Sequence, residues 1–265
     1  IVNNSSSKKE IHIGILGAMP EEIGYAIADL DNIEKKEFGD LVIYSGKWKG
    51  QSDLNIPIYI SVAWSGWGKV SAARASTRLI NTIYRDIKID LIIFTGVAGA
   101  INPNLKQWDL IIPNLLIQHD MDATPIYAKY VIPALNKKYI QPKKEIFNWI
   151  FKVLEGINTK NNLPFQKTIK GLVATGDQFI SDENSLRNMR KSIEGILAVE
   201  MEGAAVAQVC EQENIPWVVI RVISDGADDT ASLNFKEFIT TYEKFSWSLV
   251  KHILGSISIK FTDLL

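Results

Sequence analysis

Short apolar runs alternate along the chain with longer amphipathic segments, and this alternation limits the fold more than any other feature of the sequence. The runs LIIF (91–94) and WVVI (217–220) are apolar throughout, which indicates strands buried on both faces. Such strands separated by helices predict an α/β protein in which helices cover both faces of a mixed sheet. We find no internal repeat and no mid-chain linker, so residues 11–265 are expected to form a single domain.

The alternation gives a specific set of expected elements. The expected strands are Ile11–Gly17, Leu41–Gly46, Ile58–Trp64, Leu91–Thr95, Leu110–Ile117, Gly171–Thr175, Ile196–Met201 and Trp217–Ile223. The expected helices are Glu21–Leu30, Val70–Tyr84, Lys144–Ile157, Asn184–Lys191, Glu202–Glu213 and Phe235–Ser256.

The polar segment of residues 1–10 predicts a flexible lead-in to the domain. It has no starting Met, so the possibility that a signal peptide was removed stays open. We expect a cytoplasmic protein, with export or surface association as the alternative. No apolar run reaches the ~20 residues that a membrane-spanning helix needs.

Composition excludes several classes of function. A formal net charge of −1 gives no basic footprint for nucleic acid or for an anionic membrane. A single cysteine excludes an intramolecular disulfide, and three scattered histidines argue against a zinc site. We therefore expect no metal and no cofactor. Lysine pairs at 8–9, 35–36, 137–138 and 143–144 favour solvated side chains over a polyanion site.

Unusual residues follow four of the expected strands. These segments are GAMPEE (17–22), TGVAG (95–99), EME (200–202) and RVISDG (221–226). Ligands of α/β sheets bind at the carboxyl ends of strands. Glycine-rich turns let the backbone approach a ligand, and carboxylates supply acid and base groups. The clustering predicts an enzyme.

Each segment taken alone also has a structural interpretation. Pro20 followed by two acids is a good helix start, Asp225 could cap a turn, and residues 95–99 could be a tight turn. Glu200 and Glu202 fit this interpretation less well, because their neighbours are apolar. Two nucleotide motifs are excluded: SGWGK (65–69) lacks the flanking residues of a P-loop, and GILG (14–17) lacks the dinucleotide spacing.

Six segments together carry a more specific signal. GILGAMPEE, SGWGKVSAA, TGVAGA, ATGDQFI, AVEMEGAAVA and RVISDGAD occur in an order and spacing that resemble the 5′-methylthioadenosine/S-adenosylhomocysteine nucleosidases. The resemblance implies a nucleoside phosphorylase-like three-layer α/β/α sandwich with a mixed, distorted central sheet. It also implies a homodimer that hydrolyses the N-glycosidic bond of a small nucleoside substrate.

The same resemblance implies roles for individual residues. Glu22 would be the base that activates water, and Asp225, oriented by Ser224, the acid that protonates N7 of adenine. Arg221 would help to hold the water. The substrate contacts implied are Glu202 and Met201 at the ribose, Phe179 and the backbone of Ile180 at adenine, Met19, Trp67 and Phe235 around the 5′-alkylthio group, and the turn residues Val97 and Gly99.

Elementary chemistry supports this assignment. An acid and a base flanking the anomeric carbon suit an oxocarbenium-like transition state, and Asp225 must then have a raised pKa. The first loop presents Glu21 and Glu22 rather than a cation, which favours water over phosphate as nucleophile. Val97 replaces a serine that many members have, so one hydroxyl near the water is lost.

Two alternatives stay open. The substrate could be another 5′-substituted adenosine, such as 5′-deoxyadenosine or a futalosine-type nucleoside, or an exported protein could also bind glycosaminoglycan through its lysine pairs. At the strand-to-helix junction, we expect ribose hydroxyls and the helix N-terminus to stabilise Glu202. Glu200 is expected to point away from the sugar, into a structural network or solvent.

Overall fold

The computed structural model describes residues 10–157, 163–226 and 231–265, so the predicted lead-in lies, apart from Glu10, outside the described residues. A nine-stranded sheet of order β10-β9-β8-β11-β7-β1-β4-β3-β2 forms the middle layer. Its strands are β1 (Ile11–Gly17), β2 (Leu30–Phe38), β3 (Leu41–Trp48), β4 (Ile58–Trp64), β7 (Leu91–Ala100), β8 (Leu110–Gln118), β9 (Thr168–Thr175), β10 (Ile196–Glu200) and β11 (Trp217–Asp225). A separate small hairpin joins β5 (Ile83–Tyr84) to β6 (Ile87–Lys88).

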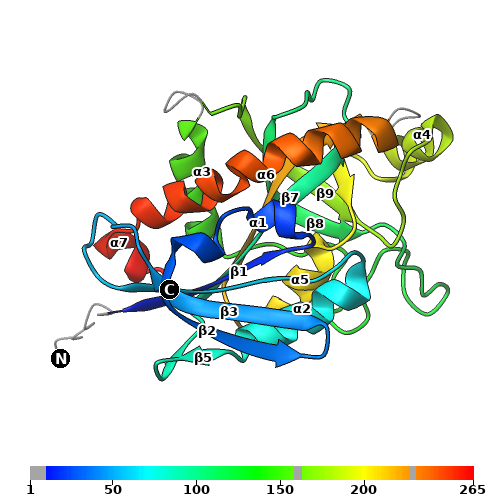
Figure 1. The fold of residues 1–265 in the computed structure, drawn as a ribbon. Helices are drawn as coiled ribbons and strands as arrows, with labels where there is room; N and C mark the ends of the chain where they lie inside the picture. The colour runs from blue at the N-terminus through cyan, green and yellow to red at the C-terminus, as the bar shows by residue number, and fades with distance from the viewer. Residues whose placement is uncertain (1–9, 158–162, 227–230) are drawn as a thin grey trace.

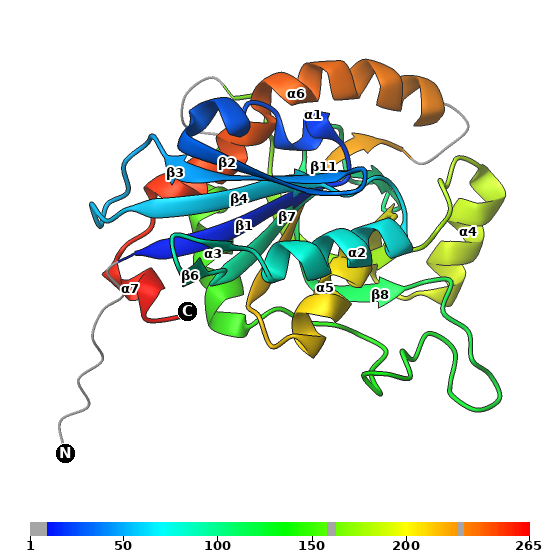
Figure 2. The ribbon, with the colours of Figure 1, turned by 60° about the horizontal axis from the view of Figure 1, so that its bottom comes forward.

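Helices cover both faces of this sheet (Figures 1 and 2). The helices are α1 (Pro20–Ile23), α2 (Lys69–Ile80), α3 (Lys144–Glu155), α4 (Glu183–Ser192), α5 (Gly203–Gln212), α6 (Ala231–Gly255) and α7 (Ile259–Thr262). Apolar side chains of α1, α3, α6 and α7 belong to one core cluster, and those of α2 and α5 to a second. The expected three-layer α/β/α sandwich is confirmed.

The sheet is mixed and bends around β7. This strand runs parallel to β1 and β11, while its last residues, Gly99 and Ala100, pair antiparallel with β10. β8 is antiparallel to β11 and parallel to β9. The long, almost entirely buried β7 thus bridges two parts of the sheet, which gives the expected distorted mixed sheet.

The expected helix Glu21–Leu30 is wrong. α1 ends at Ile23, because the next residue, Gly24, has a φ of 49°. A right-handed helix cannot continue through a residue with a positive φ. A short 3₁₀ turn, Ile27–Asp29, then leads directly into β2. β2 was not predicted, because it is an edge strand with mostly exposed polar side chains, which lack the apolar signal of a buried strand.

Two further boundaries need correction. The expected helix Val70–Tyr84 ends at Ile80, and Ile83 and Tyr84 instead form β5. The expected turn at Thr95–Gly99 lies inside β7, because its amides and carbonyls pair with β11 along this stretch. The segment therefore brings a strand, rather than a loop, to the pocket described below.

Neither a membrane span nor a metal centre is found in the described part of the chain. None of its helices is both long and apolar enough to cross a membrane. Within residues 10–157, 163–226 and 231–265, no three His, Cys, Asp or Glu side chains are grouped to hold a metal ion. The cellular compartment stays a prediction.

Candidate active site

A pocket opens where β1, β7, β10 and β11 end, and it encloses about 530 Å³ of space that is open to solvent. Twelve of the thirteen predicted site residues line it, and the remaining one, Arg221, is buried close to Glu22 and Glu200. The lining residues that the prediction did not include are Ala18, Ala98, Gln178, Val199 and Glu200. Each is a close sequence neighbour of a predicted residue and lies in one of the six segments quoted above, and the apolar neighbours of Glu200 were a further signal.

Glu22 is held in the first turn of α1 by three backbone amides. Its Oε2 accepts hydrogen bonds from the amides of Ala18 (2.6 Å) and Met19 (3.2 Å), and its Oε1 accepts from Val97 (3.0 Å). Burial raises the pKa of Glu22, while the charge of Arg221 and the three amides oppose that rise. A buried, oriented carboxylate of raised proton affinity suits a general base.

Gly96 lets Glu22 and Arg221 approach one another. A Cβ atom at this position would lie 2.3 Å from Glu22 Oε1 and 2.5 Å from Arg221 Nη1. Any side chain would therefore displace both charged groups. The glycine of the TGVAG segment is explained by this close approach rather than by a turn.

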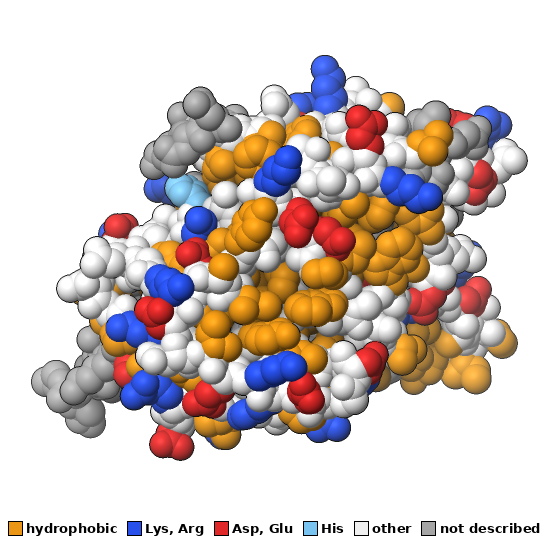
Figure 3. Space-filling model, viewed as in Figure 1, with side chains coloured by type: hydrophobic (Ala, Val, Ile, Leu, Met, Phe, Trp, Pro, Cys, Tyr) orange, Lys and Arg blue, Asp and Glu red, His pale blue; other side chains and the backbone are white. Residues whose placement is uncertain are grey.

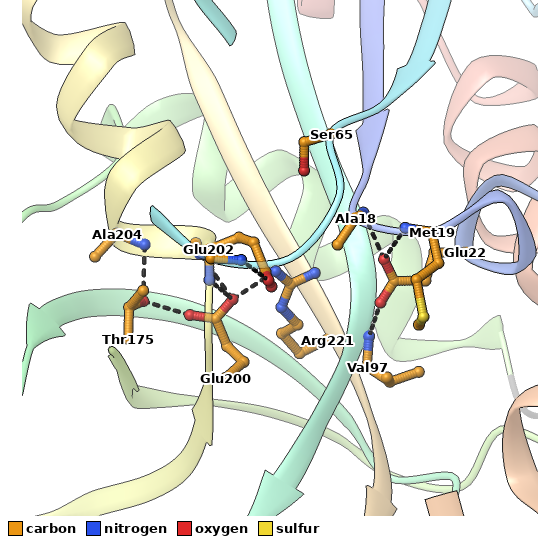
Figure 4. A network of polar contacts seen from close by, with 12 residues as sticks. Ala18, Met19, Glu22, Ser65, Val97, Thr175, Glu200, Glu202, Ala204 and Arg221 are labelled. Carbon is orange, nitrogen blue, oxygen red and sulfur yellow. Dashed lines mark hydrogen bonds and ion pairs between the residues drawn. The ribbon is translucent and has the colours of Figure 1, made fainter. Parts of the chain in front are cut away.

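Glu200 is the centre of a buried network (Figure 4). Its Oε2 accepts from Arg221 Nη2 (2.6 Å) and from the amides of Glu202 (3.1 Å) and Gly203 (2.7 Å). Its Oε1 accepts from the hydroxyl of Thr175. The expectation that Glu200 joins a structural network is thus confirmed. Its carboxylate also caps the N-terminus of α5. We had expected this helix N-terminus to stabilise Glu202 instead.

Glu202 lies at the strand-to-helix junction with its side chain directed toward α2. Its Oε1 accepts from the amide of Gly68 (2.8 Å), and the side chain is buried. Burial, and next the nearby charge of Glu200, raise the pKa of Glu202 to about 8. Hydroxyl donors from a ligand would offset that desolvation and favour the ionised form.

The raised pKa of Glu202 predicts how stability depends on pH. The folded protein binds the proton of the Glu202 carboxyl group more tightly than the unfolded chain does. The protonated carboxyl group therefore contributes its full stabilisation below the ordinary pKa of 4.5, and this stabilisation is lost as the pH rises to about 8. Glu202→Gln removes this titration. Over this pH range the free energy of unfolding of wild type should therefore fall relative to that of the variant, by about 1.4 kcal/mol for each pH unit between the two pKa values. Urea unfolding of both proteins across this range measures the difference, and a constant difference would contradict the raised pKa.

Arg221 is fully buried in β11 and lies between Glu200 and Glu22 (Figure 4). Its guanidinium stacks 4.0 Å from the ring centroid of Phe94 and donates to Glu200. Nε and Nη1 make no hydrogen bond to the described residues. Arg221 is thus the cation that offsets a buried group of carboxylates, and one of its nitrogens lies near Glu22.

Replacing Arg221 with methionine should strongly destabilise the protein. The change leaves Glu200 buried without its cation, and breaking a buried pair in this way typically costs about 3–5 kcal/mol. Lys137→Met is the matched control, because Lys137 pairs with Glu211 at 3.3 Å on the surface and should cost less than about 1 kcal/mol. Thermal or urea unfolding checks both values, and equal costs would contradict this account of Arg221.

Asp225 and Ser224 end β11 at the pocket. The Ser224 hydroxyl donates to Asp225 Oδ2 at 2.6 Å, and the Ser224 carbonyl accepts from the side-chain amide of Gln107 at 2.8 Å. Both residues are buried. This places a carboxyl group, oriented by a hydroxyl, in the same pocket as Glu22.

Three aromatic rings form one wall of the pocket. Trp67 and Phe179 stack with their centroids 6.4 Å apart and an interplanar angle of 14°, and Phe235 meets each of them edge-on at 5.9 Å. Trp67 is 50% exposed and Phe179 is 40% exposed. The sequence assigned these rings to different parts of a ligand, and the structure brings them into direct contact. Such a wall suits a flat or apolar ligand group.

Comparisons with known proteins identify relatives of this chain. The family model described as Phosphorylase superfamily matches residues 12–255. A 5′-methylthioadenosine/S-adenosylhomocysteine nucleosidase of Haemophilus influenzae (strain PittEE) is 33% identical over 246 residues, which cover 92% of this chain and 99% of that protein. The crystal structure of the Neisseria meningitidis nucleosidase with methylthio-immucillin-A has a TM-score of 0.80 and 31% identity, covering 93% of this chain and 99% of that one. The futalosine hydrolase of Helicobacter pylori strain 26695 has a TM-score of 0.76 and 30% identity, covering 92% and 97%.

Fold and site together define an α/β protein whose pocket brings carboxyl groups and aromatic rings together. The chain belongs to the phosphorylase superfamily and, within it, to the family of 5′-methylthioadenosine/S-adenosylhomocysteine nucleosidases. The prediction of a nucleosidase is thereby confirmed. The roles of its individual residues stay predictions.

Proposed function

We propose that this protein hydrolyses the N-glycosidic bond of 5′-methylthioadenosine and S-adenosylhomocysteine, releasing adenine and the 5′-thioribose product. The observation that carries the proposal is the joint presence of Glu22, Asp225 and Glu202 in one pocket walled by Phe179 and Trp67. The names of the relatives support the choice of substrate.

Glu22 and Asp225 supply the acid–base chemistry. The three amides fix the carboxylate of Glu22, and its raised pKa lets it take a proton from the attacking water. Asp225, held by Ser224, donates a proton to N7 so that adenine leaves as a neutral base. Each contribution of this kind is typically worth about 10²–10⁴-fold in rate. Arg221 lies beside Glu22 and helps to hold the water.

The remaining lining residues bind the substrate. Glu202 accepts from the ribose hydroxyls and Met201 lies against the sugar, while Phe179 stacks on adenine and the backbone of Ile180 reads its edge. Met19, Trp67 and Phe235 surround the 5′-thioether, whose sulfur packs favourably against aromatic rings. Val97 has no hydroxyl for the water, but its amide orients Glu22, and Gly99 completes this side of the pocket.

Water is the proposed nucleophile. Among the described residues that line the pocket, none is cationic. Arg221 lies behind the lining and already donates to Glu200. A pocket whose lining presents carboxylates and no cation repels inorganic phosphate.

A futalosine-type nucleoside is the second candidate substrate, because a futalosine hydrolase is almost as similar in structure as the nucleosidases. Release of the free base from 5′-methylthioadenosine, S-adenosylhomocysteine, 5′-deoxyadenosine and futalosine distinguishes the candidates. The proposal expects the largest kcat/KM for the two thioethers. A larger value for futalosine would transfer the assignment to that substrate.

We also propose that the protein is a homodimer. Figure 3 shows hydrophobic side chains gathered on the face that carries α1 and α6. Tyr25, which follows α1, is 59% exposed, and Tyr44 of β3 stacks on Trp64 of β4 with centroids 6.3 Å apart. A contiguous apolar face of this kind commonly marks an interface. Sedimentation should give twice the mass of one chain, and a single-chain mass would contradict the dimer.

Polyanion binding stays a prediction. Lysines of the pairs considered above contact the chain's own acceptors: Lys35 pairs with Glu37, Lys137 with Glu211, and Lys143 donates to the carbonyl of Leu264. These contacts favour the structural interpretation of the lysines. Retention on heparin at physiological salt would be needed to support the alternative.

A further inference from the structure

Three segments meet beside the pocket, around the side chain of Lys69. Lys69 Nζ donates to Asp120 Oδ1 (2.6 Å) and to Gln118 Oε1 (3.3 Å). Asp120 Oδ2 accepts from the amide of Asp177 (3.0 Å), and Asp177 Oδ1 accepts from the amide of Lys69 (2.7 Å). Lys69, Asp120 and Asp177 therefore close a ring of hydrogen bonds, which we call the Lys69 ring. It joins the start of α2, the residues after β8 and the residues after β9.

The Lys69 ring is connected directly to Glu202. The amides of Gly68 and Lys69 are adjacent at the N-terminus of α2, and they donate to Glu202 Oε1 (2.8 Å) and to Asp177 Oδ1 (2.7 Å) respectively. Gly68 has a φ of 92°, and a Cβ atom there would lie 3.0 Å from Asp177 Oδ1. Two neighbouring peptide units thus fix a pocket carboxylate and the first acid of the segment that carries Phe179.

Besides the Lys69 ring, residues 176–180 are held by the Gly176 amide on the Glu200 carbonyl (3.1 Å) at one end and by the burial of Ile180 at the other, with Phe179 in contact with Trp67 and Phe235. The side chains of Asp177, Gln178 and Phe179 are exposed, and only Ile180 among the four residues after Gly176 is buried. By contrast, the side chains of the Lys69–Asp120 pair are 19% and 25% exposed, so solvent screens this pair less than an ordinary surface pair. The hydrogen bonds of the Lys69 ring therefore fix the exposed part of this segment at Asp177, two residues before Phe179.

We propose that Lys69, Asp120 and Asp177 are positioning residues that fix the base-binding segment 176–180 relative to Glu202. The identity of the base as adenine rests on the proposed function. Breaking the ring loosens the backbone at Asp177 and with it Phe179, but leaves the Gly68 amide on Glu202. Affinity for the base therefore falls, while affinity for the sugar is largely kept.

The test compares two aspartates that cap helices: Asp177, which caps α2, and Asp182, which caps α4. Asp177→Ala breaks the ring, whereas Asp182→Ala, the matched control, removes a cap of α4 that accepts from the amide of Ser185 (2.8 Å). Calorimetric titration of each variant with adenine and with 5-methylthioribose gives both affinities. For Asp177→Ala we expect an adenine Kd raised at least about tenfold and a methylthioribose Kd raised less than about threefold. Asp177→Asn keeps an oxygen acceptor for the Lys69 amide and should recover most of the adenine affinity.

Equal adenine affinity in Asp177→Ala and Asp182→Ala would overturn the proposal. Equal losses of both ligands in Asp177→Ala would do so as well, because they would show a general structural defect. Thermal unfolding of the two variants checks that they are comparably folded. Wild type that binds adenine but hydrolyses no nucleoside would contradict the proposed function alone, and wild type that binds no adenine would contradict both.

Discussion

Glu22→Gln should lower kcat for 5′-methylthioadenosine by about 10²–10⁴-fold, the range expected for loss of a general base. The amide of glutamine cannot take a proton from water. It also fits the site poorly, because every hydrogen-bond partner of Glu22 in the structure is an N–H donor: the amides of Ala18, Met19 and Val97. The NH₂ group of glutamine would have to face one of them.

Glu21→Gln is the matched control for this substitution. Glu21 precedes Glu22 in the same helical turn and does not line the pocket. Its loss removes the same charge from the first loop, so any long-range electrostatic effect should appear in both variants. Steady-state rates of adenine release give the comparison. Equal kcat values for the two variants would remove Glu22 from the mechanism.

Asp225→Asn should also lower kcat by about 10²–10⁴-fold, because asparagine cannot protonate N7. An acid works only while it holds its proton, so wild-type kcat should fall as the pH rises past the pKa of Asp225. The asparagine variant should lack this alkaline limb. A base that carries an electron-withdrawing group leaves more easily without protonation. The Asp225→Asn substitution should therefore slow the hydrolysis of a nucleoside with such a base less.

Rate–pH profiles of wild type, Asp225→Asn and Ser224→Ala measure these effects. Ser224→Ala removes only the hydroxyl that orients the acid, so its loss should be smaller, about tenfold. An Asp225→Asn profile with the height and shape of wild type would show that another group protonates the base.

The buried strands were readable from the sequence because their apolar signal is local. β1 and β4 begin and end where their apolar runs do, and β11 was expected to be buried on both faces. β2 escaped because an edge strand needs no apolar face. α1 was overextended because nothing before Gly24 shows that its φ would be positive.

The pocket residues were predicted from motifs, but their contacts depend on tertiary structure. Glu200 and Glu202 are two residues apart at the end of a strand, and the sequence does not show which of them meets Arg221 and Thr175. The structure assigns both contacts to Glu200. The stacking of Trp67 on Phe179 joins a residue just before α2 to a residue of the segment after β9. No local sequence pattern encodes such a contact.

Adenine release from 5′-methylthioadenosine by the wild-type protein, measured with and without inorganic phosphate, tests the central claim most directly. We predict release at the same rate in both conditions, with free 5-methylthioribose as the second product. No release of adenine, or release that requires phosphate and yields a sugar 1-phosphate, would contradict the assignment of this protein as a hydrolase of that nucleoside.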